Sequence, residues 1–351
     1  MIGCIRRWFP TSEGYWSRVH PPLYLFLFLF FPSSSSSPSS STISSSSSSS
    51  FAISSITESF AKGYLPAHMP LAPVVPKTPG QPYAFERPEC LGWYLIPLFK
   101  LYISYAPDSF PCDWLEKTED IKVKCIDSTG NKVDFPTPPE LLKAIRKCER
   151  VNHPEKGLFS GLPSNWGFSG FMQTGAYQVL DEYPFIEHGE FCGPMFNKVH
   201  RMVYHSYPCI KGVQLFYLEQ NHWSCIMRDH SSAYEVSQVE NDPKSYFLRS
   251  ELLAAISVFY RQLHDMIWNP RVEKYKPILR YKEGFLTATV VTFIHRQVRV
   301  VQASIKPSET YPTITFTLRA IYDLNAEKYD QEVAYTVLQW ILSPPKPAEV
   351  D

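Results

Sequence analysis

Hydrophobic residues recur with a helical period between residues 242 and 269. Large apolar side chains fall three or four positions apart, which places them on one face of a helix: Leu248, Leu252, Ile256, Phe259, Leu263 and Met266. The opposite face carries mainly the polar residues Arg249, Arg261, Gln262 and Asp265. Asp242 suits a helix cap and Pro243 the first helical position, whereas Asn269 precedes a proline and is disfavoured in a helix. The pattern therefore predicts one amphipathic helix over this stretch.

Three runs of strand-forming residues follow, at 285–294, 298–305 and 313–322. The third run alternates strictly, and one of its faces is apolar: Ile314, Phe316, Leu318, Ala320 and Tyr322. Such alternation is typical of an antiparallel strand that buries one face. Residues 306–309 supply a turn between the second and third runs. We therefore predict a three-stranded meander.

A second amphipathic helix closes this part of the chain, from about Asp330 to Leu342. Its apolar stripe consists of Val333, Val337, Trp340 and Ile341. Two such helices and a meander can cover each other as two layers. Residues 241–345 are therefore expected to form a helix, three-strand meander and helix unit, followed by a tail at 346–351.

The preceding region, residues 89–240, is rich in aromatic residues, cysteine and histidine. Its shorter patterns predict a helix, a strand or both over Cys90–Tyr105, a strand over Asp120–Cys125, a helix over Pro138–Arg150, and a hairpin of Val213–Leu218 with Trp223–Arg228. Gly157–Tyr177 combines glycines with aromatic residues, so we expect a loop packed onto the domain, with an aromatic-lined pocket as the alternative. The whole pattern predicts an α+β fold, in which helices pack on a mixed or antiparallel sheet.

The N-terminal residues 1–68 differ from the rest in composition. Between Pro21 and Phe51 nearly every residue is Phe, Leu, Ser or Pro, the residues that codons made only of C and T encode. A translated pyrimidine-rich leader explains this restriction, and a serine tract has almost nothing to bury. We therefore expect 1–68 to be disordered or a spurious leader. In the alternative, Leu23–Phe31 is the core of a signal peptide, which would make the protein secreted. That run is too short to span a bilayer, so stable membrane insertion is not expected.

Residues 69–88 are rich in proline. Five prolines recur at every third position from Pro70, namely Pro70, Pro73, Pro76, Pro79 and Pro82. A polyproline II helix has three residues per turn, so these prolines would line one edge. The expected role is a stiff linker, and a ligand for an SH3-type domain at Pro70–Pro82 is the alternative.

Charge and cysteine content narrow the class of protein further. Lys plus Arg equals Asp plus Glu, at 34 each, which argues against a nucleic-acid binder. The eight cysteines include no C-x-x-C pair, so we expect dispersed thiols in a reducing compartment, the cytoplasm or nucleus. A secreted disulfide framework is the alternative.

Most of the reactive side chains lie between His188 and His230. A zinc deaminase needs a His ligand, a Glu two residues later and a downstream Pro-Cys-x-x-Cys. His188, Glu190 and Cys209 match this pattern, but Gly212 stands where the second cysteine belongs. A structural zinc site would use the four residues Cys192, His200, His205 and Cys209, whose types suit zinc although their spacings fit no familiar finger. We therefore expect no bound metal and no cofactor.

A cysteine hydrolase is the third hypothesis for these residues. The segment Gln220–Trp223 resembles the His-Trp segment of ubiquitin-like-protein proteases, whose nucleophilic cysteine lies well downstream of the histidine. Here Cys225 follows His222 by three residues. Cys192 with His222 has the papain-like order of cysteine before histidine, but lacks the sequence around the nucleophile. We expect instead that these are core and surface residues of strands, with His222 at a hairpin turn.

Four segments resemble the C-terminal part of a filamentous-fungal protein family: Phe247–Glu251, Arg299–Ala303, Ala320–Leu324 and Leu338–Pro344. That family has no assigned activity, so the resemblance implies neither a function nor a functional residue. Because no catalytic motif is complete, we favour a non-enzymatic intracellular module that binds a protein partner. The alternative is a hydrolase or metal-dependent enzyme built on the His188–His230 cluster.

Overall fold

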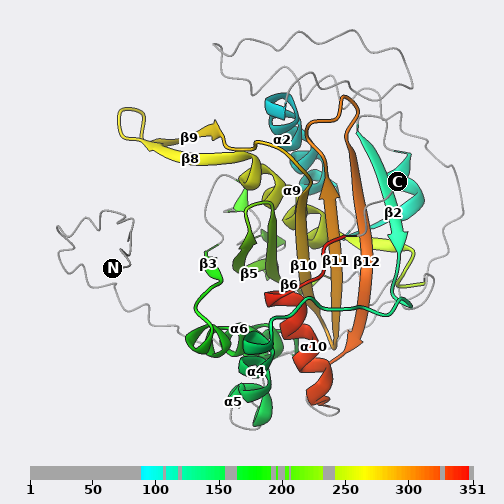
Figure 1. Ribbon diagram of the computed structural model, residues 1–351. Helices are drawn as coiled ribbons and strands as arrows, with labels where there is room; N and C mark the ends of the chain where they lie inside the picture. The colour runs from blue at the N-terminus through cyan, green and yellow to red at the C-terminus, as the bar shows by residue number, and fades with distance from the viewer. Residues whose placement is uncertain are drawn as a thin grey trace, which may run out of the picture. The chain divides into compact units, whose positions relative to one another are not determined.

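A computed structural model gives the fold of this chain (Figure 1). It describes residues 88–105, 108–117, 121–154, 164–190, 195–196, 202–204, 207–231, 242–324 and 329–347. The expectations for residues 1–68 and for the prolines of Pro70–Pro82 lie outside these described residues.

An eight-stranded mixed sheet forms the centre of the fold, which confirms the predicted α+β class. Its strands, in order across the sheet, are β2 (Lys122–Asp127), β12 (Thr313–Asp323), β11 (Gln297–Ile305), β10 (Leu286–Ile294), β6 (His222–Asp229), β5 (Tyr207–Glu219) and β3 (Glu187–Gly189), and β4 (Met202–Tyr204) also pairs with β5. Strand β10 runs parallel to β6 and β12 runs parallel to β2, while the other neighbours are antiparallel. The predicted meander is therefore the middle of a wider sheet.

Helices cover both faces of this sheet (Figure 1). The first core lies under α2 (Pro88–Ser104) and α9 (Arg249–Leu263). The second core lies under α4 (Pro139–Lys147), α5 (Glu149–Asn152), α6 (Ser164–Glu182) and α10 (Gln331–Leu342). The two-layer arrangement expected for the C-terminal unit is thus wrong, because α9 and α10 lie on opposite faces. Each large buried apolar side chain in these cores contributes roughly 1.5–3 kcal/mol.

The long predicted helix is shorter than its sequence pattern at both ends. Residues Tyr246–Leu248 form strand β7, which pairs with β1 (Ser109–Pro111), so the helix begins at Arg249 rather than at Pro243. Glu251 caps it, because its Oε2 accepts the Leu248 backbone N–H at 2.8 Å. Pairing with another segment therefore determines where the helix begins, although the local sequence pattern favours an earlier start.

Although the sequence of α9 is amphipathic, neither of its faces is exposed to solvent. Every residue of α9 except Arg261 is buried, because α2 covers the face turned away from the sheet. Arg249, expected on a solvent-exposed face, is 4% exposed and forms an ion pair with Asp108. Gln262 is buried as well and donates to the carbonyl oxygen of Thr287 at 2.9 Å.

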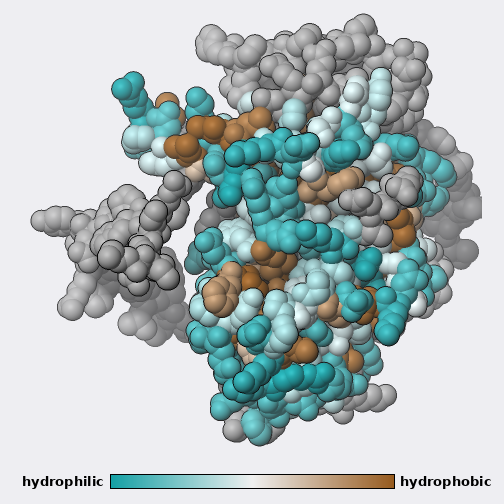
Figure 2. All heavy atoms as spheres, in the orientation of Figure 1, coloured by the Kyte–Doolittle hydropathy of each residue, from teal (hydrophilic) through white to brown (hydrophobic). Residues whose placement is uncertain are grey.

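After Leu263 the chain forms a hairpin that the sequence analysis missed. Strands β8 (His264–Asn269) and β9 (Lys274–Leu279) pair only with each other within the described part of the chain, and they extend away from the main sheet (Figure 1). Met266 consequently lies in a strand, not on a helix. Figure 2 shows brown, hydrophobic residues over this hairpin. The exposed large apolar residues here are Ile267, Trp268, Val272 and Ile278.

The structure decides two further predictions in the first half of the domain. Cys90–Tyr105 falls almost wholly in one helix, α2, which continues through Pro97. The expected loop Gly157–Tyr177 is in part helical, because residues from Ser164 onward belong to α6. By contrast, the strand predicted near Asp120–Cys125, the helix near Pro138–Arg150 and the β5–β6 hairpin are present, with boundaries shifted by a few residues.

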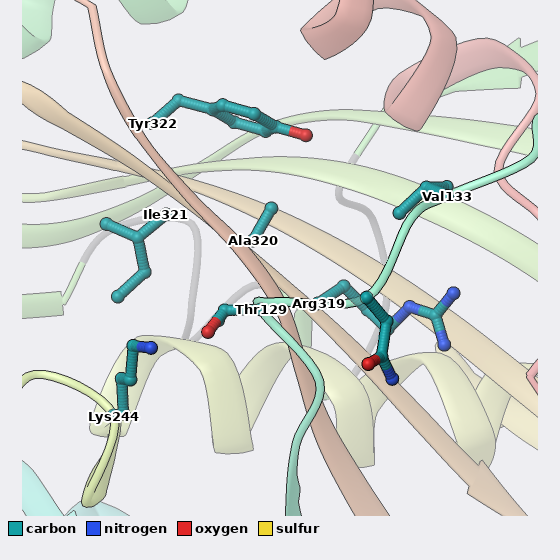
Figure 3. A pocket seen from close by; sticks show the side chains of 8 residues that line it. Thr129, Val133, Lys244, Arg319, Ala320, Ile321 and Tyr322 are labelled. Carbon is teal, nitrogen blue, oxygen red and sulfur yellow. The ribbon is translucent and has the colours of Figure 1, made fainter.

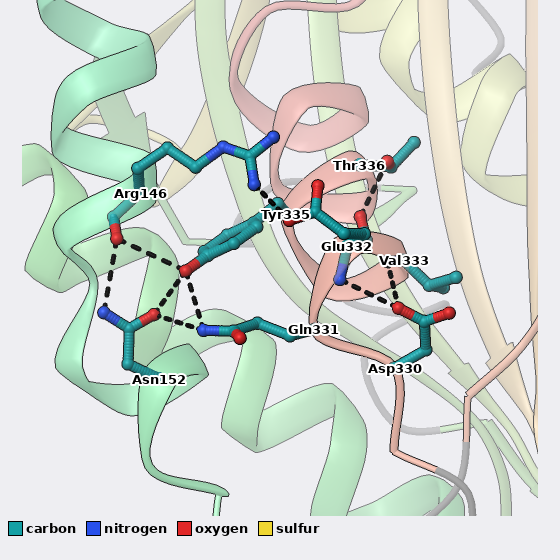
Figure 4. A network of polar contacts seen from close by, with 8 residues as sticks. All are labelled: Arg146, Asn152, Asp330, Gln331, Glu332, Val333, Tyr335 and Thr336. Carbon is teal, nitrogen blue, oxygen red and sulfur yellow. Dashed lines mark hydrogen bonds and ion pairs between the residues drawn. The ribbon is translucent and has the colours of Figure 1, made fainter.

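The predicted closing helix is confirmed as α10. Asp330 caps its N-terminus, since Asp330 Oδ1 accepts the backbone N–H groups of Glu332 at 2.9 Å and Val333 at 3.2 Å (Figure 4). No helix among the described residues has both the length and the apolar character needed to cross a membrane.

A polar network ties α10 to α4 and α5 (Figure 4). The Tyr335 hydroxyl contacts Asn152 Oδ1 and accepts from Gln331 Nε2 at 2.8 Å. Asn152 in turn donates to the carbonyl oxygen of Arg146 at 3.2 Å, and Arg146 forms an ion pair with Glu332. These contacts fix helices that are far apart in sequence, so the network has a structural role.

Candidate functional site

The sheet face that carries α10 changes character along its strands. On β10, Val291 and Phe293 belong to the second core, whereas Thr287 and Thr289 lie on the same face toward the start of the strand. The helices cover the apolar part of the face and leave the polar part beside it. Hydrophilic residues predominate over the sheet above α10 (Figure 2). A polar surface on an otherwise apolar sheet is the most promising place for a site.

A pocket of about 550 Å³ opens on this polar surface. Because it lies where several strands begin or end, its wall combines segments that are distant in sequence. The charged residues that line it are Lys122, Lys124, Glu219, Lys306, Glu309 and Lys346. Hydroxyl groups line it between these charges: Thr287, Ser304, Thr313 and Thr315. We call this site the lysine pocket.

The positive charge in the lysine pocket is only partly balanced. Lys346 lies 3.0 Å from Glu219, and Lys306 lies 3.6 Å from Glu309. Lys122 and Lys124 both project from β2 and are exposed, and no carboxylate of the described residues lies within ion-pair distance of either. An uncompensated pair of lysines beside hydroxyl donors favours an anionic ligand.

His222 lines the same pocket and is 5% exposed. Its Nε2 lies 3.0 Å from the Thr289 hydroxyl, which also accepts from Gln302 Nε2 at 3.2 Å. Because Gln302 donates to that oxygen, the Thr289 hydrogen can point to His222 Nε2, which leaves the ring hydrogen on Nδ1. Burial lowers the pKa of His222 from 6.5 to about 4, so the ring is neutral at pH 7.

The C-terminal segment helps to close this pocket. After α10 the chain crosses the sheet face, where the carbonyl oxygen of Pro345 accepts from Gln302 Nε2 at 2.6 Å. The Ser224 hydroxyl donates to the carbonyl oxygen of Ile341 at the end of α10. Lys346 and Pro347 then form part of the pocket wall. Lys346 and Pro347 are therefore components of the site.

The structure separates His222 from Cys225. The two residues are three positions apart on β6, so they lie on opposite faces of the sheet. Cys225 is fully buried in the first core, where burial raises the pKa of its thiol well above the usual range. A hydrolytic dyad of His222 with Cys225 is therefore excluded. His222 is the first residue of β6, not a turn residue.

His188 and His230, the other histidines of the cluster that the structure describes, do not lie beside His222. His188 and Glu190 lie exposed at β3, which is two strands from β6, and His188 Nδ1 lies 3.5 Å from Gln214 Nε2. His230 follows the far end of β6, where burial and the nearby Arg228 lower its pKa to about 4.

Most of the candidate zinc ligands lie outside the residues that the structure describes. Cys192, His200 and His205 lie outside the described residues, and of Cys209 only the backbone, in β5, is described. Within the described ranges no three His, Cys, Asp or Glu side chains are arranged to hold a metal ion.

A second, smaller pocket of about 280 Å³ lies at the other end of β12 (Figure 3). It is lined by Thr129, Lys244 and Arg319 among others. Arg319 falls at an irregularity in the pairing of β12 with β11, and its guanidinium lies 5.6 Å from the centre of the Trp340 ring. Its buried Nε has no hydrogen-bond partner in the described structure.

Sequence reasoning singled out His222 but missed the lysine pocket, because its lysines come from three separate segments and form no local motif. No protein-family model and no curated protein matches this chain.

Proposed function

We propose that the protein is a non-enzymatic module that binds an anionic ligand in the lysine pocket. The ligand class is a small molecule or side chain that carries phosphate or carboxylate groups. The observation that carries this proposal is the pair Lys122 and Lys124, which has no described acidic partner and faces a wall of hydroxyl groups. Lysine ammonium groups and hydroxyls together satisfy the oxygens of such anions.

The pocket supports binding better than catalysis. The neutral imidazole of His222 is held by Thr289, and the described lining of the pocket contains no cysteine or serine within hydrogen-bond distance of the ring. A pocket of about 550 Å³ falls within the range of ordinary ligand sites, which is about 300–1,000 Å³. The neutral histidine would act as a hydrogen-bond donor to the ligand.

Calorimetric titration of the purified protein with pyrophosphate and with citrate tests the proposal. Replacing the two pocket lysines of β2 in Lys122→Ala/Lys124→Ala should weaken binding about tenfold, because each partly solvated charge contributes up to about 1 kcal/mol. The matched control is Lys143→Ala, an exposed lysine on α4. Binding should also weaken with added salt. Equal affinities of the double variant and the control would refute the proposal.

A hydrolase that uses Cys192 with His222 is the second candidate. It is favoured by one observation, the neutral state of the buried His222, since a general base must be unprotonated. Hydrolysis of a p-nitrophenyl ester that disappears in both Cys192→Ala and His222→Gln would support it. Equal rates for these variants and the wild-type protein would exclude it.

We also propose an intracellular location, in the cytoplasm or nucleus, and a protein partner. The five cysteines whose side chains are described form no disulfide, which supports a reducing compartment. Fractionation of cells that express the natural protein tests the location, and recovery only from the medium would contradict it.

A further inference from the structure

Two cysteines of different elements meet at the edge of the sheet. Cys112 begins helix α3 (Cys112–Glu116), and Cys125 lies in the edge strand β2. The Cys125 thiol donates to the carbonyl oxygen of Cys112, with Sγ and oxygen 3.8 Å apart, so the Cys125 sulfur lies directly against Cys112. Both residues are partly exposed, so small oxidants can reach them.

We propose that Cys112 and Cys125 form a redox-active pair, which closes to an intramolecular disulfide when a peroxide reaches it. The Cys112 thiolate attacks one peroxide oxygen, which yields a sulfenic acid and releases hydroxide. The hydroxide takes up the proton that the Cys112 thiol lost on ionising and becomes water. The Cys125 sulfur then attacks the Cys112 sulfur, loses its proton and expels the sulfenic hydroxyl as water. The two thiols are oxidised by two electrons, and one hydrogen peroxide is reduced to two molecules of water.

The groups around the two thiols determine which cysteine reacts with the peroxide and which one resolves the sulfenic acid. The hydrogen bond from Cys125 lowers the pKa of Cys112, and the positive charge of Arg299 acts in the same direction. The same contact, together with burial, raises the pKa of Cys125. Cys112 is therefore the sulfur that attacks the peroxide, and Cys125 is the sulfur that resolves the sulfenic acid.

The position of the pair gives the bond a consequence for the fold. It would join α3 to β2, the edge strand that has only β12 as a partner within the described sheet. Lys122 and Lys124 alternate with Val123 and Cys125 on this strand, so the pair lies behind the wall of the lysine pocket. Closing a loop of 13 residues restricts the unfolded chain, so oxidation should raise the melting temperature by roughly 5 °C.

Peptide mapping without reduction, after treatment of the full-length protein with hydrogen peroxide, tests this inference. The wild-type protein should lose two titratable thiols and yield a peptide pair linked through Cys112 and Cys125. Cys90→Ser, which removes another partly exposed thiol, should still yield that pair. Cys125→Ser should instead accumulate a sulfenic acid on Cys112 that dimedone traps. Folding of each variant is checked by its circular dichroism.

Two outcomes would overturn the inference. One is oxidised wild-type protein in which Cys112 ends as a sulfinic acid without any linked peptide. The other is equal dimedone labelling of Cys112 in the wild-type protein and in Cys125→Ser, because a resolving thiol must compete with the trap. No ligand is needed in these measurements, so the result is independent of the lysine pocket.

Discussion

Arg299 and Glu251 form the most deeply buried ion pair among the residues that the structure describes. Their side chains are 1% and 0% exposed, and Arg299 Nε lies 2.8 Å from Glu251 Oε1. Arg299 also donates to the carbonyl oxygens of Pro243 at 2.7 Å and Tyr246 at 3.0 Å. The pair thus joins β11 to α9 and to the β7 segment before it, and all the guanidinium contacts are made inside the protein.

Replacing Arg299 with methionine keeps most of the side-chain volume and removes the charge. The Glu251 carboxylate would then stay buried without its cation, so Arg299→Met should lower the free energy of unfolding by about 3–5 kcal/mol. The Pro243 and Tyr246 carbonyl oxygens would also lose a donor. The exposed pair of Arg280 with Asp265, at 3.3 Å, is the control, and Arg280→Met should cost less than about 1 kcal/mol.

Urea unfolding of four proteins measures the coupling within the pair. These are the wild type, Arg299→Met, Glu251→Leu and the double variant. If each single change leaves an uncompensated buried group, the double variant should be more stable than the sum of the two single losses allows. Additive losses, or an Arg299→Met variant that costs no more than Arg280→Met, would refute the reasoning.

Three further predictions concern single side chains. Phe259→Ala should lower the free energy of unfolding by about 3–5 kcal/mol, because Phe259 is fully buried under the sheet. Arg261→Ala should cost under about 0.5 kcal/mol, and similar urea midpoints for the two variants would contradict this. His222 has a folded-state pKa of about 4 against 6.5 when unfolded, so the unfolded chain binds its proton first and stability falls as pH drops from 6.5 toward 4. Relative to His222→Gln, the wild type should lose about 3 kcal/mol over that window, and parallel pH profiles would exclude the buried neutral ring. Arg319→Met should leave stability unchanged or raise it by up to about 1 kcal/mol, because it removes a buried Nε that has no partner and keeps the contact with Trp340. A clearly lower melting temperature of the variant would show that Arg319 is paired.

Elements with strong local signals could be predicted from the sequence. The alternation of Ile314, Phe316 and Leu318 identified β12, and the apolar stripe of Val333 and Val337 identified α10. Even there the structure adds a feature, since the pairing of β12 with β11 shifts register, and Ala320 packs in the second core while Leu318 packs in the first. A bulge of this kind depends on the partner strand and leaves no mark in the alternation itself.

The ends and the environment of α9 were decided by tertiary contacts. Asp242 and Pro243 suit a helix start, but Tyr246–Leu248 gains more by pairing with β1, and the helix begins after it. Polar positions such as Arg249 and Gln262 predicted a solvent-exposed face, yet both are buried, because Arg249 pairs with Asp108 and Gln262 donates to the Thr287 carbonyl oxygen of the sheet. A periodic pattern shows which residues are polar. Whether a polar side chain can be buried in the protein depends on a buried partner such as Arg299.

The candidate sites show most clearly which features follow from the local sequence and which depend on tertiary contacts. By itself the sequence determined the α+β class, the meander and the closing helix, because these follow from interactions between residues close in the chain. Only the tertiary structure brought Lys122, Lys306 and Lys346 to one pocket, placed Cys125 beside Cys112 and put His222 and Cys225 on opposite faces. Which distant segments become neighbours depends on how the whole sheet buries its apolar surface, and no short pattern along the chain encodes that arrangement.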